Sequence, residues 1–334
     1  MDRFGPRLTI LTLGAVVALA GAAPPSADLP IRSAQWLDPS QRLQALSSQP
    51  LECAAIPRAP GERKLFEIGR AAFRAPLLLG GQAARSGLSC ASCHSNGRRN
   101  QAFLFPSLSG EPGTADVTSS LMSAHRGNGV FDPKPIPDLA VPDKVSRRPG
   151  DPALETFIRG LIVEEFDGAE PPALILQGLG TYVRAIGRPG CDLQGHVPLR
   201  LATMTGDAAR AVDASAQAWR GGDIAAARLL LSSARSTLGL IDERYDTASL
   251  VKDRQAIRRA DRALLAIGQA IDRRATDVAT RLAAWRADMP RWTARLVRDQ
   301  AQSLFSPARL AHMLGGAVPN PHSAPARDAG SLRR

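Results

Sequence analysis

Aromatic residues are scarce in this chain of 334 residues: they make up 4% of it, whereas hydrophobic residues as a whole make up 44%. We therefore expect a core of mainly Ala, Leu, Ile and Val, large enough for one large domain or two modest ones. Blocks of Arg or Lys interleaved with aromatic residues are also missing, which argues against nucleic-acid binding. The formal charge of +11 comes nearly all from Arg and favours acidic partners or an anionic membrane surface.

Long hydrophobic runs are rare as well. The run at 8–20 has about 13 residues, fewer than the roughly 20 that a membrane-spanning helix needs, and we expect no further segment of that kind. Arg3 and Arg7 precede or border it, and small residues follow with A-x-A spacing. This pattern predicts a secretory signal peptide over residues 1–22 and a mature protein in the periplasm. An uncleaved membrane anchor is the alternative. No cysteine lies near the expected cleavage point, which argues against a lipoprotein.

The sequence contains one Cys-x-x-Cys-His motif, Cys90-Ala91-Ser92-Cys93-His94, in a chain with only four cysteines and five histidines. Two thiols three residues apart lie on one side of a helical turn, where they can add to the two vinyl groups of one porphyrin. The adjacent His94 then supplies the proximal nitrogen to the iron. The motif predicts one covalently bound haem c, held by Cys90, Cys93 and His94.

Two other kinds of site use a pair of cysteines at this spacing. A zinc site would need a second Cys-x-x-Cys or a His-x-x-x-His partner, and the sequence has neither. A thioredoxin-like redox pair would follow a strand and begin a helix, whereas Gly80, Gly81 and Gly87 precede this motif. Both alternatives are therefore weaker than haem attachment.

The residues around the motif resemble a known family. The stretch from Ile68 to Phe73, followed by 87–94, is similar to the N-terminal part of bacterial di-haem cytochrome c peroxidases, with their order of leader helix, short loop and S-C-x-x-C-H. Residues 179–186 are similar to the C-terminal helix of a cytochrome c domain. The resemblance covers about 62–188. It implies a peroxidase in which one haem delivers an electron to a second, but this chain has a single haem motif, and that mechanism is in doubt.

The sixth ligand of the iron decides the function. A Met ligand favours electron transfer, a second His lowers the potential, and an open position permits peroxide to bind. The candidates are Met122 and, as the alternative, His125, about 28 residues after the motif in a long Gly/Pro/Ser-rich loop that we expect to wrap a haem edge. Arg126 is a weaker candidate for a haem propionate contact. Three further candidates fall at or beyond the expected domain boundary: Met204, Met289 and His196.

The remaining cysteines, Cys53 and Cys191, flank the expected haem domain. An oxidising compartment favours their pairing, and closing so long a loop would add about 4–5 kcal/mol to stability on the chain-entropy estimate. The alternative is two free thiols.

The expected fold is mainly α, with a cytochrome c-like haem domain followed by an α-helical hairpin or bundle. Apolar residues recur every seven positions from Leu250 to Trp285, which predicts one helix of roughly 35 residues ended by Pro290. Other helices are expected at 40–46, 61–73, 153–161, 172–186, 207–220, 223–245 and 291–305. The expected parts are an irregular arm at 23–60, the haem domain at 61–190, the helical domain at 205–314 and a disordered tail at 315–334.

Three functions fit these observations. The first is a mono-haem carrier whose basic surface docks an acidic redox partner. The second is a cytochrome c peroxidase-like enzyme that reduces hydrogen peroxide at a haem with an open sixth position. In the third, the heptad helix mediates assembly, and the haem tunes or senses.

Overall fold

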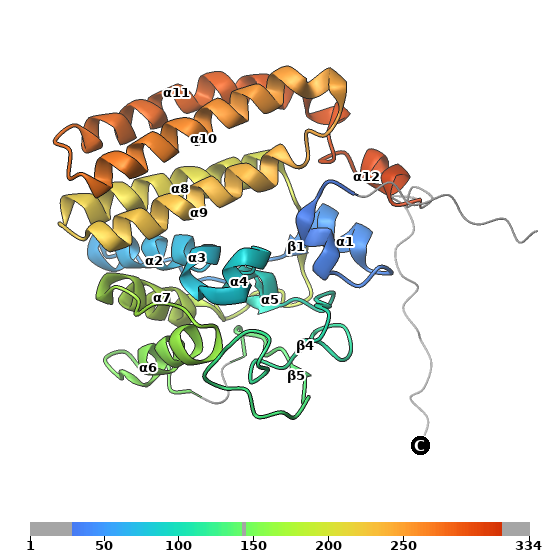
Figure 1. Cartoon of the computed structure of the whole chain (residues 1–334), viewed down its shortest axis with the longest axis vertical. Helices are drawn as coiled ribbons and strands as arrows, with labels where there is room; N and C mark the ends of the chain where they lie inside the picture. Colours follow the sequence, from blue (N-terminus) through green and yellow to red (C-terminus); the bar gives the residue numbers. More distant parts are fainter. Residues whose placement is uncertain (1–28, 142–144, 316–334) are drawn as a thin grey trace, which may run out of the picture.

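The protein is mainly helical, as the sequence predicts, in a computed structural model that describes residues 29–141 and 145–315. The helices form stacked layers, with the long C-terminal helices covering one face of the shorter N-terminal ones (Figure 1). The expected signal peptide, and the expected tail after Gly315, lie outside the described residues.

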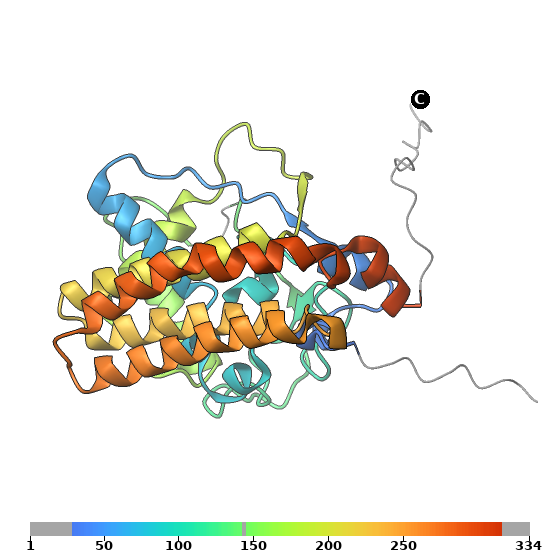
Figure 2. The same ribbon diagram turned by 90° about the horizontal axis from the view of Figure 1, so that it is seen from above.

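The C-terminal region is a bundle of four consecutive helices. They are α8 (Leu201–Arg220), α9 (Ile224–Asp242), α10 (Val251–Asp272) and α11 (Val278–Asp299). Helices α8 and α9 lie next to the rest of the molecule, and α10 and α11 form the outermost layer (Figures 1 and 2). The Asp223 side chain caps α9 by accepting a hydrogen bond of 2.9 Å from the Ala226 backbone N–H. The expectation of a bundle with a cap at this residue is confirmed.

The prediction of one long helix over 250–285 is wrong. The chain reverses at 273–277, where Arg274 adopts a positive φ of 53°, and the seam continues on α11. Ile271 and Val278 are seven residues apart on either side of the turn, so the heptad spacing runs through it unbroken. Pro290 lies inside α11 rather than ending it. Its neighbours Trp285 and Trp292 are buried, and this packing outweighs the cost of a missing backbone N–H.

The N-terminal region is built on two crossing helices, α2 (Pro60–Ala72) and α7 (Ala173–Ala185), with α6 (Ala153–Gly160) against α7. Their backbones meet at Gly69 and Gly178, where a Cβ on Gly69 would overlap the carbonyl of Gly178. Only glycine permits so close an approach. The helices expected at 61–73, 153–161 and 172–186 are confirmed.

Shorter elements fill the space between the long helices. The arm contains α1 (Arg42–Ser47), near the helix expected at 40–46, and β1 (Ser48–Pro50), which pairs antiparallel with β6 (His196–Pro198). The remaining short elements, some of them 3-10 or π turns, are η1 (Arg32–Trp36), α3 (Pro76–Leu79), α4 (Gly81–Ser86), α5 (Cys90–Cys93), β2 (His94–Ser95), β3 (Arg98–Arg99), β4 (Thr114–Ala115), β5 (Lys134–Pro135), η2 (Leu161–Glu165), η3 (Ala248–Leu250), η4 (Gln300–Gln302) and α12 (Pro307–Met313).

One hydrophobic core runs through both regions. It extends from Phe66 and Tyr182 between α2 and α7 to Leu230 and Leu264 in the bundle. Ser233 on α9 donates a hydrogen bond of 2.8 Å to the backbone carbonyl of Ala71 on α2, which fixes the two layers together. A second, smaller cluster joins the N-terminal arm to α12. The N-terminal region and the bundle therefore share their interior.

Helix α9 is long and apolar enough to cross a membrane by length and composition, and half of it is buried in the bundle. By length and hydropathy alone, the expectation that no second segment long and apolar enough to span a membrane follows residues 8–20 is wrong. The same composition is typical of the central helix of a bundle, which is the position that α9 occupies.

Candidate functional site

The two cysteines of the motif lie on a single helical turn, α5, held at both ends by hydrogen bonds. Ser89 and Ser92 form a capping box, in which the Ser89 backbone N–H donates to Ser92 Oγ over 3.1 Å. Asn100 holds the other end, because its side chain donates to the Ser92 carbonyl and its backbone N–H to the Cys93 carbonyl, over 2.8 and 2.9 Å. The local sequence therefore fixes the separation of the two thiols.

Cys90 and Cys93 are free thiols and only partly exposed. Burial raises the pKa of each to about 12, so both are protonated at neutral pH. A thioredoxin-type pair works through a thiolate of lowered pKa. This environment argues against that alternative.

His94 follows directly, as the first residue of the hairpin β2–β3. The turn of this hairpin is Asn96-Gly97, with φ of 51° and 74°, the positive pair that a two-residue hairpin turn requires. Burial lowers the pKa of His94 to about 4, against an opposing effect of the Pro137 carbonyl, so the imidazole is neutral. Its Nδ1 is buried and has no hydrogen-bond partner. A neutral imidazole is the form that binds metals.

An aromatic wall stands beside this imidazole. The Phe73 ring lies 6.4 Å from the His94 ring, and the Tyr182 ring 5.1 Å from Phe73, measured between centroids. Tyr182 donates a hydrogen bond of 2.7 Å to Glu52. Phe73 and Tyr182 come from the ends of α2 and α7, so the crossing of these helices positions the wall.

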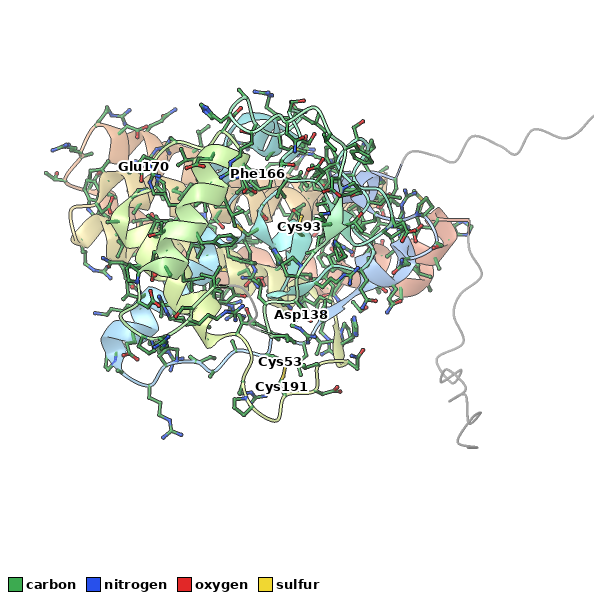
Figure 3. The ribbon with its side chains drawn as sticks, turned by 90° about the horizontal axis from the view of Figure 1, so that it is seen from below. Cys53, Cys93, Asp138, Phe166, Glu170 and Cys191 are labelled. Atoms are coloured by element: carbon green, nitrogen blue, oxygen red, sulfur yellow. A yellow bond between two sulfur atoms is a disulfide. The ribbon has the colours of Figure 1, made fainter. Side chains whose placement is uncertain are left out.

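Arg98 and Asp138 tie the hairpin to the segment that contains Pro137. Arg98 Nε lies 2.8 Å from Oδ1 and Nη2 lies 2.7 Å from Oδ2 of Asp138, a two-pronged pair, and the Arg98 side chain is 7% exposed. Burial acts to raise the pKa of Asp138, but the hydrogen bonds from Arg98 and from the Ala140 N–H outweigh it and hold that pKa below its ordinary value. Figure 3 shows Asp138 close to the disulfide.

A second buried cation, Arg74, links the hairpin to the bundle. It donates a hydrogen bond of 2.8 Å to the Asn96 side chain and lies 3.4 Å from a Glu52 oxygen and 3.7 Å from an Asp207 oxygen. Burial acts to lower the pKa of Arg74, but Asp207, Tyr182 and Glu52 together raise it. The site is thus braced by α8 as well as by its own region.

The structure separates the candidate sixth ligands. Met122 is 1% exposed and belongs to the core that also contains Leu88 and Leu108. The His125 side chain is 67% exposed, and its Nε2 lies 3.8 Å from an Asp167 oxygen. Arg126 is exposed and forms ion pairs with the exposed Glu164 and the largely buried Glu165, so its charge is directed to carboxylates of the protein.

The more distant candidates have other surroundings. Met204 lines a cleft beside the motif, Met289 accepts a hydrogen bond of 3.3 Å from Arg286, and His196 is exposed on β6. That cleft has a volume of about 680 Å³, and its lining includes Trp36 and Ser92 near the motif and Arg235 and Asp261 from the bundle.

Cys53 and Cys191 form a disulfide across 138 residues, with their Cα atoms 5.7 Å apart (Figure 3). The predicted pairing is confirmed. Arg98 Nη1 lies 3.9 Å from the Cys53 sulfur, so the disulfide packs directly on the Arg98–Asp138 pair.

A zinc site gains no support from the geometry. Within 29–141 and 145–315, no three His, Cys, Asp or Glu side chains gather closely enough to hold a metal ion. Tetrahedral zinc requires further ligands beyond Cys90 and Cys93. Haem attachment differs, because it asks the motif for only one metal ligand.

Sequence analysis missed Arg74, Pro137 and the Arg98–Asp138 pair. Pro137 and Asp138 belong to the loop expected to wrap a haem edge, but nothing in the local spacing marks them as neighbours of His94.

Comparison with known proteins gives no match: no protein-family model, no curated protein and no solved structure is similar to the chain.

Proposed function

We propose that the protein is a mono-haem c-type cytochrome of the periplasm that transfers electrons. One observation carries the proposal: two neutral thiols lie on one helical turn directly before a neutral, buried imidazole. They remain unpaired although the other two cysteines of the chain form a disulfide. Thiols kept apart from disulfide chemistry in this arrangement suit covalent attachment to a porphyrin.

The residues present fit a haem in specific roles. Cys90 and Cys93 would form the two thioether bonds and His94 would bind the iron, which cycles between its ferric and ferrous states when haem is bound. The Nδ1 of His94 is buried without a hydrogen-bond partner, and the Pro137 carbonyl is the backbone acceptor that raises the pKa of the ring against burial. With haem bound, a backbone acceptor at the ring nitrogen that does not bind the iron would orient the imidazole and raise its basicity as a ligand.

The surroundings restrict the movement of this ligand. Phe73 packs beside the imidazole and Tyr182 packs on Phe73, while the Arg98–Asp138 pair holds the backbone next to Pro137. An apolar wall around the ring limits access of water, and burial is one of the levers that set a haem's reduction potential. A rigid ligand set suits electron transfer, because little reorganisation accompanies a change of oxidation state.

A cytochrome c-like arrangement of the region 61–190 belongs to this proposal. The leader helix expected from the resemblance corresponds to α2, and the expected C-terminal helix to α7. Their crossing at Gly69 and Gly178 brings both ends of the region together behind the motif. This supports a single compact haem-binding unit backed by the bundle.

A buried Met122 favours an electron carrier over the peroxidase-like alternative. Its thioether lies in the core, whereas the alternative ligand His125 lies at the surface beside Asp167. A thioether ligand raises the potential and closes the sixth position. A peroxidase-like enzyme would need that position open.

The disulfide indicates the compartment of the protein, and the net charge indicates the kind of partner. A disulfide suits an oxidising compartment, in agreement with the expected signal peptide. A net charge of +11 favours an acidic redox partner, with an anionic membrane surface as the other attractive surface.

The decisive experiment measures the mass and the pyridine haemochrome spectrum of mature protein from cells competent in cytochrome maturation. We expect the mass of one haem and a c-type spectrum. Cys90→Ser with Cys93→Ser should abolish both, whereas Cys53→Ala with Cys191→Ala, which removes the other two cysteines, should retain them. A colourless wild-type protein with no added mass would refute the proposal.

A further inference from the structure

The outer face of the bundle contains a groove that the haem proposal does not use. Its lining comes from α10 and α11 alone, so it opens away from α8 and α9, on the outermost layer seen in Figure 2. Its volume is about 670 Å³. The lining residues of each helix recur at spacings of three and four: Ala256, Arg259, Ala260, Ala263, Ala266 and Ile267 on α10, and Arg281, Ala284, Trp285, Asp288, Arg291, Trp292 and Arg295 on α11.

The groove has an apolar floor and a basic rim. Alanines and two tryptophans form the floor, while four arginines and one aspartate belong to the rim. Arg259 has no ion-pair partner among the residues that the structure describes. Arg281 and Arg291 pair with the exposed Asp277 and Asp288, and surface pairs of this kind contribute little and can be exchanged.

Charge in this part of the chain is strongly one-sided. Residues 251–299 contain 12 Lys or Arg and 6 Asp or Glu, so about half of the chain's net charge of +11 lies within these two helices and their turn. The haem motif lies on the other side of α8 and α9 (Figure 1). This basic layer is therefore distant from the motif.

We propose that this groove binds an acidic amphipathic helix of a partner protein. Small floor residues such as Ala263 and Ala284 let a third helix approach closely, and helices pack by placing ridges at three- and four-residue spacing into such grooves. Carboxylates along the edges of that helix would meet Arg259, Arg281 and Arg291. The inference does not depend on haem binding.

Two other occupants fit the groove less well. A second copy of the chain would bring the same excess of positive charge to the interface. A membrane would favour aromatic rings that can enter the headgroup layer, but Trp285 and Trp292 are only 6% and 9% exposed. They pack 6.0 Å apart, and the Trp285 indole N–H donates to the Ala260 carbonyl over 3.0 Å.

The probe for the test is a labelled synthetic helix with a Leu/Ala stripe flanked by glutamates, and its twin with lysine in place of each glutamate. Binding to the full mature protein is followed by fluorescence anisotropy. We expect the acidic peptide to bind, its lysine twin not to bind, and added salt to weaken the complex. Absence of binding by the acidic peptide would overturn the proposal.

Charge reversal at matched positions distinguishes binding in the groove from general electrostatic attraction to the positively charged protein. Arg259→Glu with Arg291→Glu should weaken binding by about tenfold or more. Arg262→Glu with Arg298→Glu makes the same change of charge at exposed positions of α10 and α11 outside the groove, and should cost much less. Equal losses in the two variants would overturn the proposal.

A neutral substitution tests the shape of the floor. Ala263 is exposed, so Ala263→Gln should leave the fold intact while obstructing the groove, and should weaken binding by several-fold. Binding to phosphatidylglycerol vesicles but not to the peptide would indicate a membrane surface instead. Dimers in light scattering that the Arg259→Glu, Arg291→Glu variant abolishes would indicate a second copy instead. Either result would overturn the proposal.

Discussion

Arg98 and Asp138, 40 residues apart, form a partly buried two-pronged ion pair, and the Asp138 charge acts on the His94 imidazole. Arg98 is on the strand paired with the one that begins at His94, and Asp138 follows Pro137, whose carbonyl acts on the His94 ring. The pair therefore links the hairpin that contains His94 to the segment that contains Pro137.

Removing one member of this pair should destabilise the protein strongly. Asp138→Ala leaves the Arg98 charge buried and uncompensated, and we expect a loss of about 3–5 kcal/mol in the free energy of unfolding, measured with urea. The double variant Arg98→Met, Asp138→Leu removes both charges and should lose less. A double variant that is less stable than Asp138→Ala would contradict this explanation.

The same pair predicts a dependence of stability on pH. The pKa of Asp138 lies below its ordinary 3.8 in the folded protein, so the unfolded chain binds more protons as the pH falls below about 5. The contribution of Asp138 is therefore present above that range and is lost as the pH falls through its lowered pKa. Asp138→Asn should flatten the acid limb of the stability profile. Parallel acid limbs in wild type and variant would assign the pH dependence to other groups.

Met122 and His125 can be distinguished by optical spectroscopy. Met122→Leu keeps an apolar side chain in the core but removes the thioether, so the long-wavelength Met–iron charge-transfer band of the ferric protein should disappear. His125→Ala should leave this band unchanged, because His125 is exposed. A high-spin wild-type haem that reacts with peroxide would instead support the enzyme alternative.

Gly69 should tolerate no side chain. In Gly69→Ala the new Cβ overlaps the Gly178 carbonyl, which forces α2 and α7 apart, and we expect a loss of about 3 kcal/mol in urea unfolding. Gly61→Ala, also on α2, meets nothing within 4 Å and serves as the control. It should be neutral or slightly stabilising. Similar losses in both variants would show that the close approach of α2 and α7 at Gly69 is not the cause.

The disulfide should contribute to stability rather than to haem attachment. Cys53→Ala with Cys191→Ala opens a loop of well over 100 residues and should cost about 4–5 kcal/mol in the free energy of unfolding. Haem content should remain one per chain. Thiol counting on denatured, unreduced wild-type protein checks the premise, and reactive Cys53 and Cys191 would disprove it.

Local pattern predicted a good part of this molecule. The cap at Asp223, the helix before the motif and the turn that presents Cys90 and Cys93 all depend on residues close together in the sequence. The pairing of Cys53 with Cys191 was predicted from the expected oxidising compartment and from the fact that only two cysteines lie outside the motif. The separation of His125 from the core did not follow, because burial depends on residues such as Asp167 in a distant segment.

Long-range features escaped sequence reasoning for a physical reason. Arg74 meets Asp207 133 residues later, and the many arginines of the chain make any one pairing impossible to single out from composition. The reversal at 273–277 was hidden because both α10 and α11 use the same heptad seam to pack on α8 and α9. Periodicity reports which face is buried, not whether the chain has turned back.

The continuous interior has a consequence for any attempt to dissect this chain. Expressing residues 61–190 alone would expose the face of α2 that packs on α8 and α9. The Ala71 carbonyl would lose its hydrogen bond from Ser233, and Arg74 would lose its ion pair with Asp207. Such a fragment should be insoluble or misfolded even if its cysteine pair is intact. The bundle is therefore a structural prerequisite for the N-terminal region, and we expect that the two cannot be exchanged between proteins as independent modules.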